Sequence, residues 1–288
     1  MKVFAIGDLH LSGNPPTKPM DIFGPHWDNH WSRIKEDWID RVTDEDIVFL
    51  VGDMSWALRL DEAACDLQEI ASMPGKKYMI RGNHDYWWAS ANKMRNLMGD
   101  AITFLQGHGT AELIQTEEGP RIIAFGGTRA YLCPGDSHFT PETDQSIYDR
   151  ELMRTEAALQ EMNKAVDILR EEITAEANVD ITKLNKADTT DSDKAYPSAI
   201  DIDSIPVTKI LLLHYPPFNE SNAPSGFTDL IEQYKVDTCI FGHLHDQISF
   251  KRIPKEFGSA KLELVSADYL DFRPVSYTHL RAHETVLD

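Results

Sequence analysis

The sequence predicts an α/β fold in which two β-sheets pack between helices. Short apolar runs without alternating polar residues recur along the chain, and such runs are typical of strands buried on both faces. Most of these runs end in a polar turn that contains glycine. Stretches with apolar residues spaced by about 3.6 lie between the runs and predict helices. Because ligands bind beyond the carboxyl ends of strands in open α/β sheets, the turns are where we expect a site.

The expected elements follow in chain order. The runs that end at the polar turns predict strands at residues 3–6, 47–51, 78–80, 210–213 and 238–241. Further strands are expected at residues 102–105, 111–115, 121–125, 248–250 and 262–266. Helices are expected at residues 31–42, 60–72 and 151 to about 177. This number of strands fits two sheets packed between helices.

The composition is that of a globular protein with an acidic surface. The 288 residues, of which 42% are hydrophobic and 26% charged, suffice for one large domain or two small ones. The formal net charge of -19 disfavours broad non-specific binding of DNA or RNA, because such a surface repels phosphate backbones. A small anionic substrate stays compatible with this charge, since bound divalent metal ions invert the local potential.

The cysteines and the first residues indicate a cytoplasmic protein. Cys65, Cys133 and Cys239 have no paired spacing, which excludes a disulfide framework and fits a reducing compartment. Residues 2–8 have the pattern of a buried strand and not of a signal peptide. No apolar run approaches the roughly 18–20 residues that span a bilayer, so we expect no membrane association.

A polar stretch at residues 171–204 interrupts the pattern. It holds nine Asp or Glu against three Lys, and Tyr196 is its one aromatic residue. A segment of this composition buries too little apolar surface to offset the entropy of ordering it. We therefore expect one domain over residues 1–274 that carries an acidic insertion at about 171–204, whose second half is mobile.

Several polar turns offer metal ligands. Two of them have the form Asp-x-His or His-x-His, and residues two apart in an extended turn point to the same side. Each residue alone has a simpler reading: a lone Asp8 is a turn residue and a lone His214 a core histidine. Their joint occurrence at strand ends favours a metal site. The candidate ligands are Asp8, His10, Asp53, Asn83, His214, His243 and His245.

The ligand types narrow the choice of metal. Carboxylate, imidazole and amide oxygen suit Mn, Fe or Zn, and the lack of thiolate argues against a structural zinc site. A carboxylate can bridge two ions about 3.5–4 Å apart, which is the spacing in two-metal phosphatases. Two such ions would share the charge of a phosphate and convert a bound water into hydroxide.

Together, five blocks resemble the signature of the calcineurin-like metallophosphoesterases. The blocks are Gly7-Asp8-Leu9-His10, Gly52-Asp53, Gly82-Asn83-His84-Asp85, His214 and Gly242-His243-Leu244-His245. The resemblance implies a four-layer sandwich of two mixed β-sheets flanked by helices, with a dinuclear metal site at the carboxyl ends of the strands. It further implies that Asp53 bridges two metal ions and that His84, which is no ligand, acts on the phosphate or the leaving group.

The same resemblance divides the ligands between the two ions. One ion would be held by Asp8, His10, Asp53 and His245, and the other by Asp53, Asn83, His214 and His243. Other stretches are similar to a group of small bacterial phosphoesterases of uncertain substrate. They are residues 18–24, 81–88, 214–219 and 267–272.

The tail at residues 275–288 does not resemble the family. It is similar to translated sequencing-adapter read-through, so we expect it to serve no core.

Two further residues are candidates for the chemistry. Arg129 follows a Gly-Gly turn and could clamp a phosphate oxygen, with a surface ion pair as the alternative. Asp85 is expected to assist catalysis by orienting His84 or a metal ligand.

The resemblance implies hydrolysis of a phosphate ester, either a monoester or a diester, by a metal-bound hydroxide. The expected partner is a small phosphorylated substrate or a phosphoprotein. A nuclease of the same superfamily is one alternative, but it would need a basic groove or a DNA-binding domain. A non-catalytic metal-binding scaffold is the other, and it would predict the loss of His84 or of a ligand; none is lost.

Overall fold

Two β-sheets form the centre of the molecule in this computed structural model, which describes residues 1–187 and 202–277. In the first sheet the order is β11-β1-β2-β3-β4, and all neighbours are parallel except β11 and β1. Its strands are β1 (Val3–Ile6), β2 (Ile47–Val51), β3 (Lys76–Ile80), β4 (Ile102–Phe104) and β11 (Val275–Ser276). The sheet is therefore mixed, as expected.

The second sheet has the order β5-β6-β7-β8-β10-β9 and is also mixed. The pairs β5–β6 and β10–β9 are antiparallel, and the central pairs are parallel. Its strands are β5 (His108–Thr116), β6 (Gly119–Thr128), β7 (Val207–Leu213), β8 (Thr238–Phe241), β9 (Glu256–Phe257) and β10 (Ala260–Leu264).

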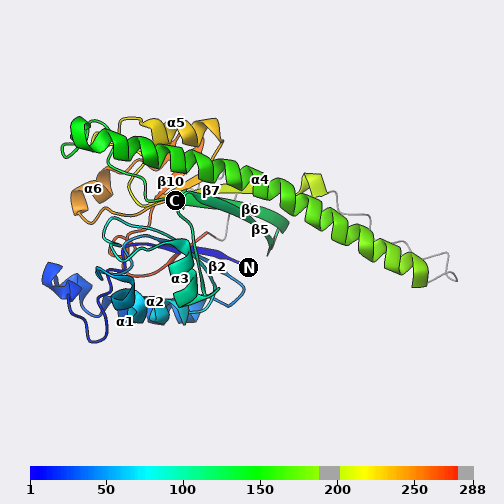
Figure 1. Cartoon of the computed structure of the whole chain (residues 1–288), viewed down its shortest axis with the longest axis horizontal. Helices are drawn as coiled ribbons and strands as arrows, with labels where there is room; N and C mark the ends of the chain where they lie inside the picture. Colours follow the sequence, from blue (N-terminus) through cyan, green and yellow to red (C-terminus); the bar gives the residue numbers. More distant parts are fainter. Residues whose placement is uncertain (188–201, 278–288) are drawn as a thin grey trace.

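Helices cover the outer face of each sheet, which gives four layers (Figure 1). The first sheet is covered by α1 (His30–Arg41), α2 (Leu60–Ala71) and α3 (Ala91–Met98). The second is covered by α4 (Pro141–Ala187) and α5 (Gly226–Gln233). Short elements in the connections are η1 (Met20–Phe23), η2 (Pro25–Trp27), η3 (Ile202–Ser204) and α6 (Gln247–Arg252). The predicted sandwich of two mixed sheets flanked by helices is confirmed.

Strand β1 shows why its sequence lacks alternation. Phe4 and Ile6 pack into the core beneath the helices, whereas Val3 and Ala5 pack into the core between the two sheets. Both faces of the strand are buried, so every position is apolar. The core between the sheets also contains Phe125, which lies 4.9 Å from Phe49 between ring centroids and so joins the sheets.

The prediction of a strand at residues 248–250 is wrong, because these residues belong to α6. Asp246 caps this helix: its carboxylate accepts hydrogen bonds from the main-chain N–H groups of Ile248 and Ser249. A three-residue apolar pattern does not distinguish a strand from a short helix. The capping residue Asp246 favours the helix here. The sequence analysis also missed α3 and α5.

Helix α4 begins at Pro141, ten residues before the predicted start, and continues to Ala187. It packs on β5 and β6, where Ala158, Leu159 and Met162 are buried, and then runs beyond the sheets (Figure 1). The first part of the predicted acidic insertion is thus a continuation of this helix. Residues 188–201, on which the expectation of mobility mainly falls, lie outside the described residues.

The start of the tail departs from the expectation that it serves no core. Val275 and Ser276 form β11 on the edge of β1, and the N–H of Tyr277 donates to the carbonyl of Val3 at 2.8 Å. Main-chain pairing requires no particular side chains, so an unfamiliar sequence can still complete an open sheet edge. The rest of the tail, residues 278–288, is outside the described residues. In the described part of the chain, no helix is long and apolar enough to cross a membrane.

Candidate metal centre

The carboxyl ends of strands from both sheets meet at one place. Main-chain hydrogen bonds fasten them: the N–H of Asp8 donates to the carbonyl of Gly52 at 2.8 Å within the first sheet. The N–H of Gly7 donates to the carbonyl of Val265, which directly follows β10 of the second sheet, at 2.7 Å. The turns after β1, β2, β3, β7 and β8 therefore bring their polar side chains together. Because those side chains come from both sheets, the site depends on the whole sandwich.

Four candidate ligands have a left-handed backbone. The φ angles are 58° at Asp8, 50° at His10, 57° at Asp53 and 74° at His243. This conformation is uncommon for residues with a side chain and is found mostly where the surroundings enforce it, as at functional sites. Here it turns the chain sharply after each strand, so the side chains face one shared space.

Glycine is required where the turns touch the ligands. A Cβ atom on Gly82 would lie 2.0 Å from Oδ1 of Asp53, and one on Gly242 would lie 2.5 Å from Oδ2 of Asp8. Any side chain at these positions would displace a carboxylate. The glycines of the sequence blocks thus act through close packing against the ligands.

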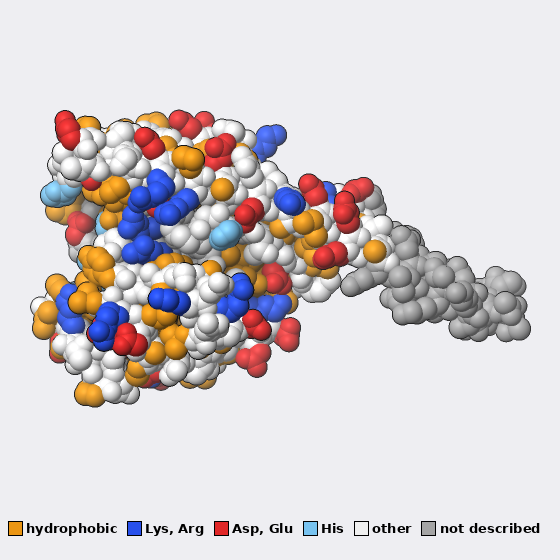
Figure 2. Space-filling view, viewed as in Figure 1, with side chains coloured by type: hydrophobic (Ala, Val, Ile, Leu, Met, Phe, Trp, Pro, Cys, Tyr) orange, Lys and Arg blue, Asp and Glu red, His pale blue; other side chains and the backbone are white. Residues whose placement is uncertain are grey.

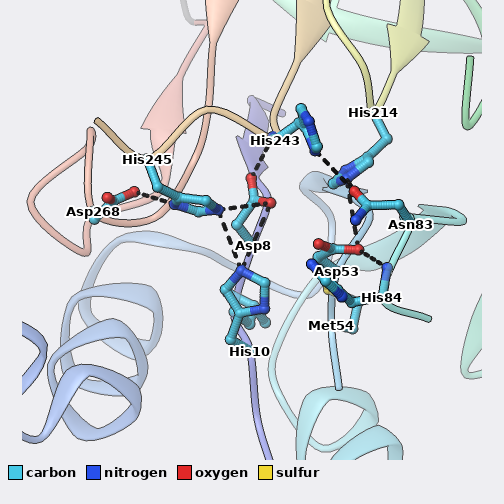
Figure 3. A network of polar contacts seen from close by, with 12 residues as sticks. Asp8, His10, Asp53, Met54, Asn83, His84, His214, His243, His245 and Asp268 are labelled. Carbon is cyan, nitrogen blue, oxygen red and sulfur yellow. Dashed lines mark hydrogen bonds and ion pairs between the residues drawn. The ribbon is translucent and has the colours of Figure 1, made fainter. Parts of the chain in front are cut away.

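Asp8, His10 and His245 form a first group (Figure 3). Nε2 of His245 lies 3.4 Å from Oδ1 of Asp8 and 3.2 Å from Nε2 of His10. Asp8 is fully buried, and its Oδ1 has no hydrogen-bond donor among the described residues. Asp268 accepts a hydrogen bond from Nδ1 of His245 at 3.0 Å on the far side of the ring.

The second group consists of Asp53, Asn83, His214 and His243. Oδ1 of Asn83 lies 2.6 Å from Nε2 of His214 and 2.8 Å from Nδ1 of His243. Oδ1 of Asp53 lies 3.5 Å from Nε2 of His214. Asp8 also falls within ligand distance of Asp53 and His214, so its carboxylate reaches both groups. All seven predicted ligands are therefore brought together.

The donor atoms fit cations. His214 donates its Nδ1 hydrogen to the carbonyl of Val51 at 2.9 Å, so its Nε2 presents a lone pair to the oxygen of Asn83. At His245, Asp268 accepts the Nδ1 hydrogen, and Nε2 faces Oδ1 of Asp8 and a nitrogen of His10. Contacts between lone pairs are repulsive unless a cation lies among them, and this donor set suits Mn, Fe or Zn.

The pKa values of Asp53 and His245 reflect the buried carboxylates of this cluster. Burial raises the pKa of Asp53 to about 7, and the charges of Asp85 and Asp8 add to that rise. Burial acts to lower the pKa of His245, but the carboxylates of Asp8 and Asp268 outweigh it and raise the pKa to about 10. In the chain alone, a proton on His245 supplies part of the positive charge that this cluster requires.

His84 and Asp85 occupy different environments. The ring of His84 is half-buried, lies 4.4 Å from that of Trp56, and has an Nδ1 atom without a hydrogen-bond partner in the described part of the chain. Its main-chain N–H donates to Oδ1 of Asp53 at 2.7 Å. The pKa of His84 is lowered, mainly by burial and then by the nearby His214 and Lys18. A neutral imidazole edge beside the centre can therefore meet a substrate.

Asp85 is fully buried and does not orient the ring of His84. Its carboxylate accepts hydrogen bonds from the main-chain N–H groups of Asp53, Met54 and Gly82 at 2.7–2.9 Å. It therefore fixes the two turns that carry Asp53 and Asn83. Of the two roles expected for Asp85, the contacts match the positioning of ligands.

Positive charge gathers beside the second group despite the net charge of -19. Figure 2 shows Lys and Arg side chains together where the two halves of the body meet. Burial and the charges of Arg129 and Arg154 lower the pKa of Arg81, which places the three guanidinium groups near one another. In the described part of the chain, the Nε atoms of Arg81 and Arg129 are buried without partners and Arg129 forms no ion pair. The surface ion pair considered for Arg129 is thus not seen there.

The sequence analysis missed several neighbours of the centre. Asp268 orients His245, and the ring of Trp56 stacks on that of His10 with 4.7 Å between centroids. Lys18 lies over Trp56, 3.1 Å from the ring centroid. Asp268 and Lys18 fall within stretches that resemble other phosphoesterases, but no spacing in the sequence indicates what they contact.

Fold and site together define a class: an α/β sandwich with candidate metal ligands at the strand ends where its two sheets meet. The chain belongs to the calcineurin-like phosphoesterases, whose sequence model matches residues 1–247. Proteins of this family are metal-dependent hydrolases. A search of curated proteins finds no match.

Solved structures with partial similarity to the chain have low sequence identity to it. A protein of unknown function, AQ665 from Aquifex aeolicus, is 12% identical over 96% of this chain and 95% of its own, with a TM-score of 0.43. The calcineurin-like phosphoesterase YfkN from Bacillus subtilis is 13% identical over 93% and 82%, with a TM-score of 0.43. Purple acid phosphatase PPD1 from yellow lupin is 15% identical over 85% and 38%, with a TM-score of 0.36.

Proposed function

We propose that this protein hydrolyses phosphate esters at a centre of two metal ions. The observation that carries the proposal is the meeting of carboxylate oxygens and imidazole nitrogens in two adjacent groups, where Oδ1 of the buried Asp8 has no hydrogen-bond donor among the described residues. The first ion would be held by Asp8, His10, Asp53 and His245. The second would be held by Asp53, Asn83, His214 and His243. Because these ligands come from both sheets, residues 1–274 would act as one unit.

Bound ions supply Lewis-acid chemistry, since they polarise phosphoryl oxygens and lower the pKa of water. The chain contributes the remaining functions. Arg129 and Arg81 offer guanidinium groups to the phosphate oxygens beside the second group, where neither Nε has a partner in the described part of the chain. His84 presents a half-buried imidazole that can hydrogen-bond to the phosphate or transfer a proton to the leaving oxygen.

A screen of metal-reconstituted protein tests the proposal. The substrates are phosphate monoesters, diesters, phosphopeptides and cyclic nucleotides, each with Mn, Fe or Zn. We expect hydrolysis of at least one ester class that requires the metal and is abolished in Asp53→Asn. Tight binding of ions without turnover on any ester would reject the proposal and favour a metal-binding scaffold.

A further inference from the structure

A pocket of about 370 Å³ lies beside the metal centre on the side of the second sheet. It is formed by the loop after β6, the loop after β7 and helix α6, at the end of the molecule where α6 is labelled in Figure 1. Its volume is within the range of about 300–1,000 Å³ that is typical of small-molecule sites. No step of the proposed hydrolysis uses it.

The lining of the pocket combines apolar side chains with polar ones such as Glu220 and Arg252. The apolar side chains include Tyr131, Leu132, Phe218, Leu244 and Ile253, two of which are aromatic. Flat aromatic groups bind well between such walls, because they bury a large area and stack against neighbouring rings.

Hydrogen bonds hold the two loops in place, so the pocket is preformed. Both oxygens of Asp136 accept main-chain hydrogen bonds at 2.7 Å, one from Cys133 and one from Glu220. Asn219 donates to the carbonyl of Pro134 at 3.1 Å and accepts from the N–H of Ser221 at 3.0 Å. Both oxygens of the Asp136 carboxylate are therefore engaged in hydrogen bonds with main-chain N–H groups of the two loops.

Tyr215 and His243 connect the pocket to the metal centre. Both line the pocket, and their ring centroids are 4.1 Å apart. His243 also touches Asn83 of the second group, while Tyr215 follows His214 directly. A molecule whose phosphate lies at the centre can thus extend past His243 into the pocket.

We propose that this pocket binds a flat aromatic group in the non-phosphate part of the substrate. The assignment rests on the proposed phosphoesterase function and narrows it to esters that carry an aromatic ring on the leaving side. Ile248 offers a test, because it lines the pocket from α6 and its side chain is 63% exposed. A tryptophan there would cover the mouth without disturbing the core.

The variant Ile248→Trp is compared with Ile39→Trp, a matched control on α1 whose isoleucine is also 63% exposed and lies outside the pocket. Kinetics are measured with methyl, phenyl and 2-naphthyl phosphate. Ile248→Trp should raise the KM for 2-naphthyl phosphate about tenfold, since a buried ring contributes an effect of that order. It should leave the KM for methyl phosphate unchanged, and Ile39→Trp should change neither.

Saturation-transfer NMR with 2-naphthol on the zinc-reconstituted protein gives a second reading that needs no turnover. Signals that weaken in Ile248→Trp alone support the pocket, and signals equal in all three proteins overturn it. An equal change in KM for all three esters would also overturn it. If neither these three esters nor any ester of the wider screen is hydrolysed, the proposed function fails, and the 2-naphthol signals still decide whether the pocket takes an aromatic ring.

Discussion

Asp268 holds the ring of His245 with its Nε2 directed at the other residues of the candidate metal centre. Its Oδ1 accepts the hydrogen of Nδ1 at 3.0 Å, which leaves Nε2 to face Asp8 and His10. A carboxylate behind a ligating histidine fixes the tautomer of the ring and increases its basicity, and removing such a partner costs about 10–100-fold in metal affinity.

We therefore expect Asp268→Ala to weaken the binding of Mn²⁺ or Zn²⁺ about 10–100-fold in calorimetric titrations. Asp271→Ala is the control, because Asp271 belongs to the same turn but pairs with Arg33 at the surface and is 74% exposed. Equal affinities in the two variants would mean that His245 needs no partner.

The assignment of the shared ligand is a second prediction. The resemblance implies that Asp53 bridges the two metal ions, whereas the carboxylate of Asp8 lies within ligand distance of both groups. We expect Asp53→Asn to lower metal content at both positions and Asp8→Asn to lower it at one. Elemental analysis of the purified variants measures this, and the opposite pattern would make Asp8 the bridge.

Asp46 fastens the beginnings of two neighbouring strands. It is buried, and its carboxylate accepts hydrogen bonds from the N–H of Lys2 at 2.6 Å and that of Thr43 at 2.9 Å. Burial acts to raise the pKa of Asp46, but these hydrogen bonds outweigh it and the pKa is lowered. A lowered carboxyl pKa stabilises the fold above the unfolded pKa of about 3.9. That stabilisation is lost as the pH falls through the folded value.

We expect Asp46→Asn to reduce the free energy of unfolding at pH 7 by about 1–2 kcal/mol. The difference from wild type should shrink as the pH falls from about 3.9 through the lowered pKa of folded Asp46, because the carboxylate is then protonated in both the unfolded and the folded state. Urea unfolding at several pH values measures it. Asp44→Asn, at an exposed position two residues earlier, should leave the curve unchanged. A loss that is constant with pH would show that ionisation of Asp46 contributes nothing.

The strand ends were predictable, because β1, β2, β7 and β8 are buried on both faces and therefore read as apolar runs. Six candidate ligands follow these strands directly in the sequence and Asn83 follows β3, so the seven could be found without a structure. Asp268 could not, since its contact with His245 joins two turns that no periodicity relates. The capping of α6 by Asp246 was equally hidden, as three apolar residues fit a strand and a helix alike.

The beginning of the tail gives a fourth prediction. Truncation after Tyr277 should leave the melting temperature unchanged, whereas truncation after Pro274 should lower it by a few degrees. The second cut removes β11 and the half-buried Tyr277, which packs against the core between the sheets. Thermal unfolding of the two truncated proteins measures the difference. Identical curves would mean that the pairing with β1 contributes no stability.

The last prediction concerns His84. The chain positions this residue through its main chain, since its N–H donates to Asp53 while its ring packs beside Trp56. Among the described residues no ligand atom pairs with a nitrogen of that ring, so His84→Ala should keep its metal content. Turnover should fall by about 10²–10⁴ if the imidazole assists proton transfer to the leaving oxygen. His26→Ala, at an exposed position of η2, is the control for histidine loss.

The size of that loss should depend on the leaving group. An activated group such as p-nitrophenolate leaves without a proton, whereas a more basic oxygen needs one, so the ratio of wild-type to variant rates should grow with leaving-group basicity. Rates for a series of aryl phosphates, with metal content determined in parallel, separate the possible roles. Loss of a metal ion would make His84 a ligand. A large loss that is the same for every leaving group would assign the ring to the phosphate oxygens, because charge there develops regardless of what departs.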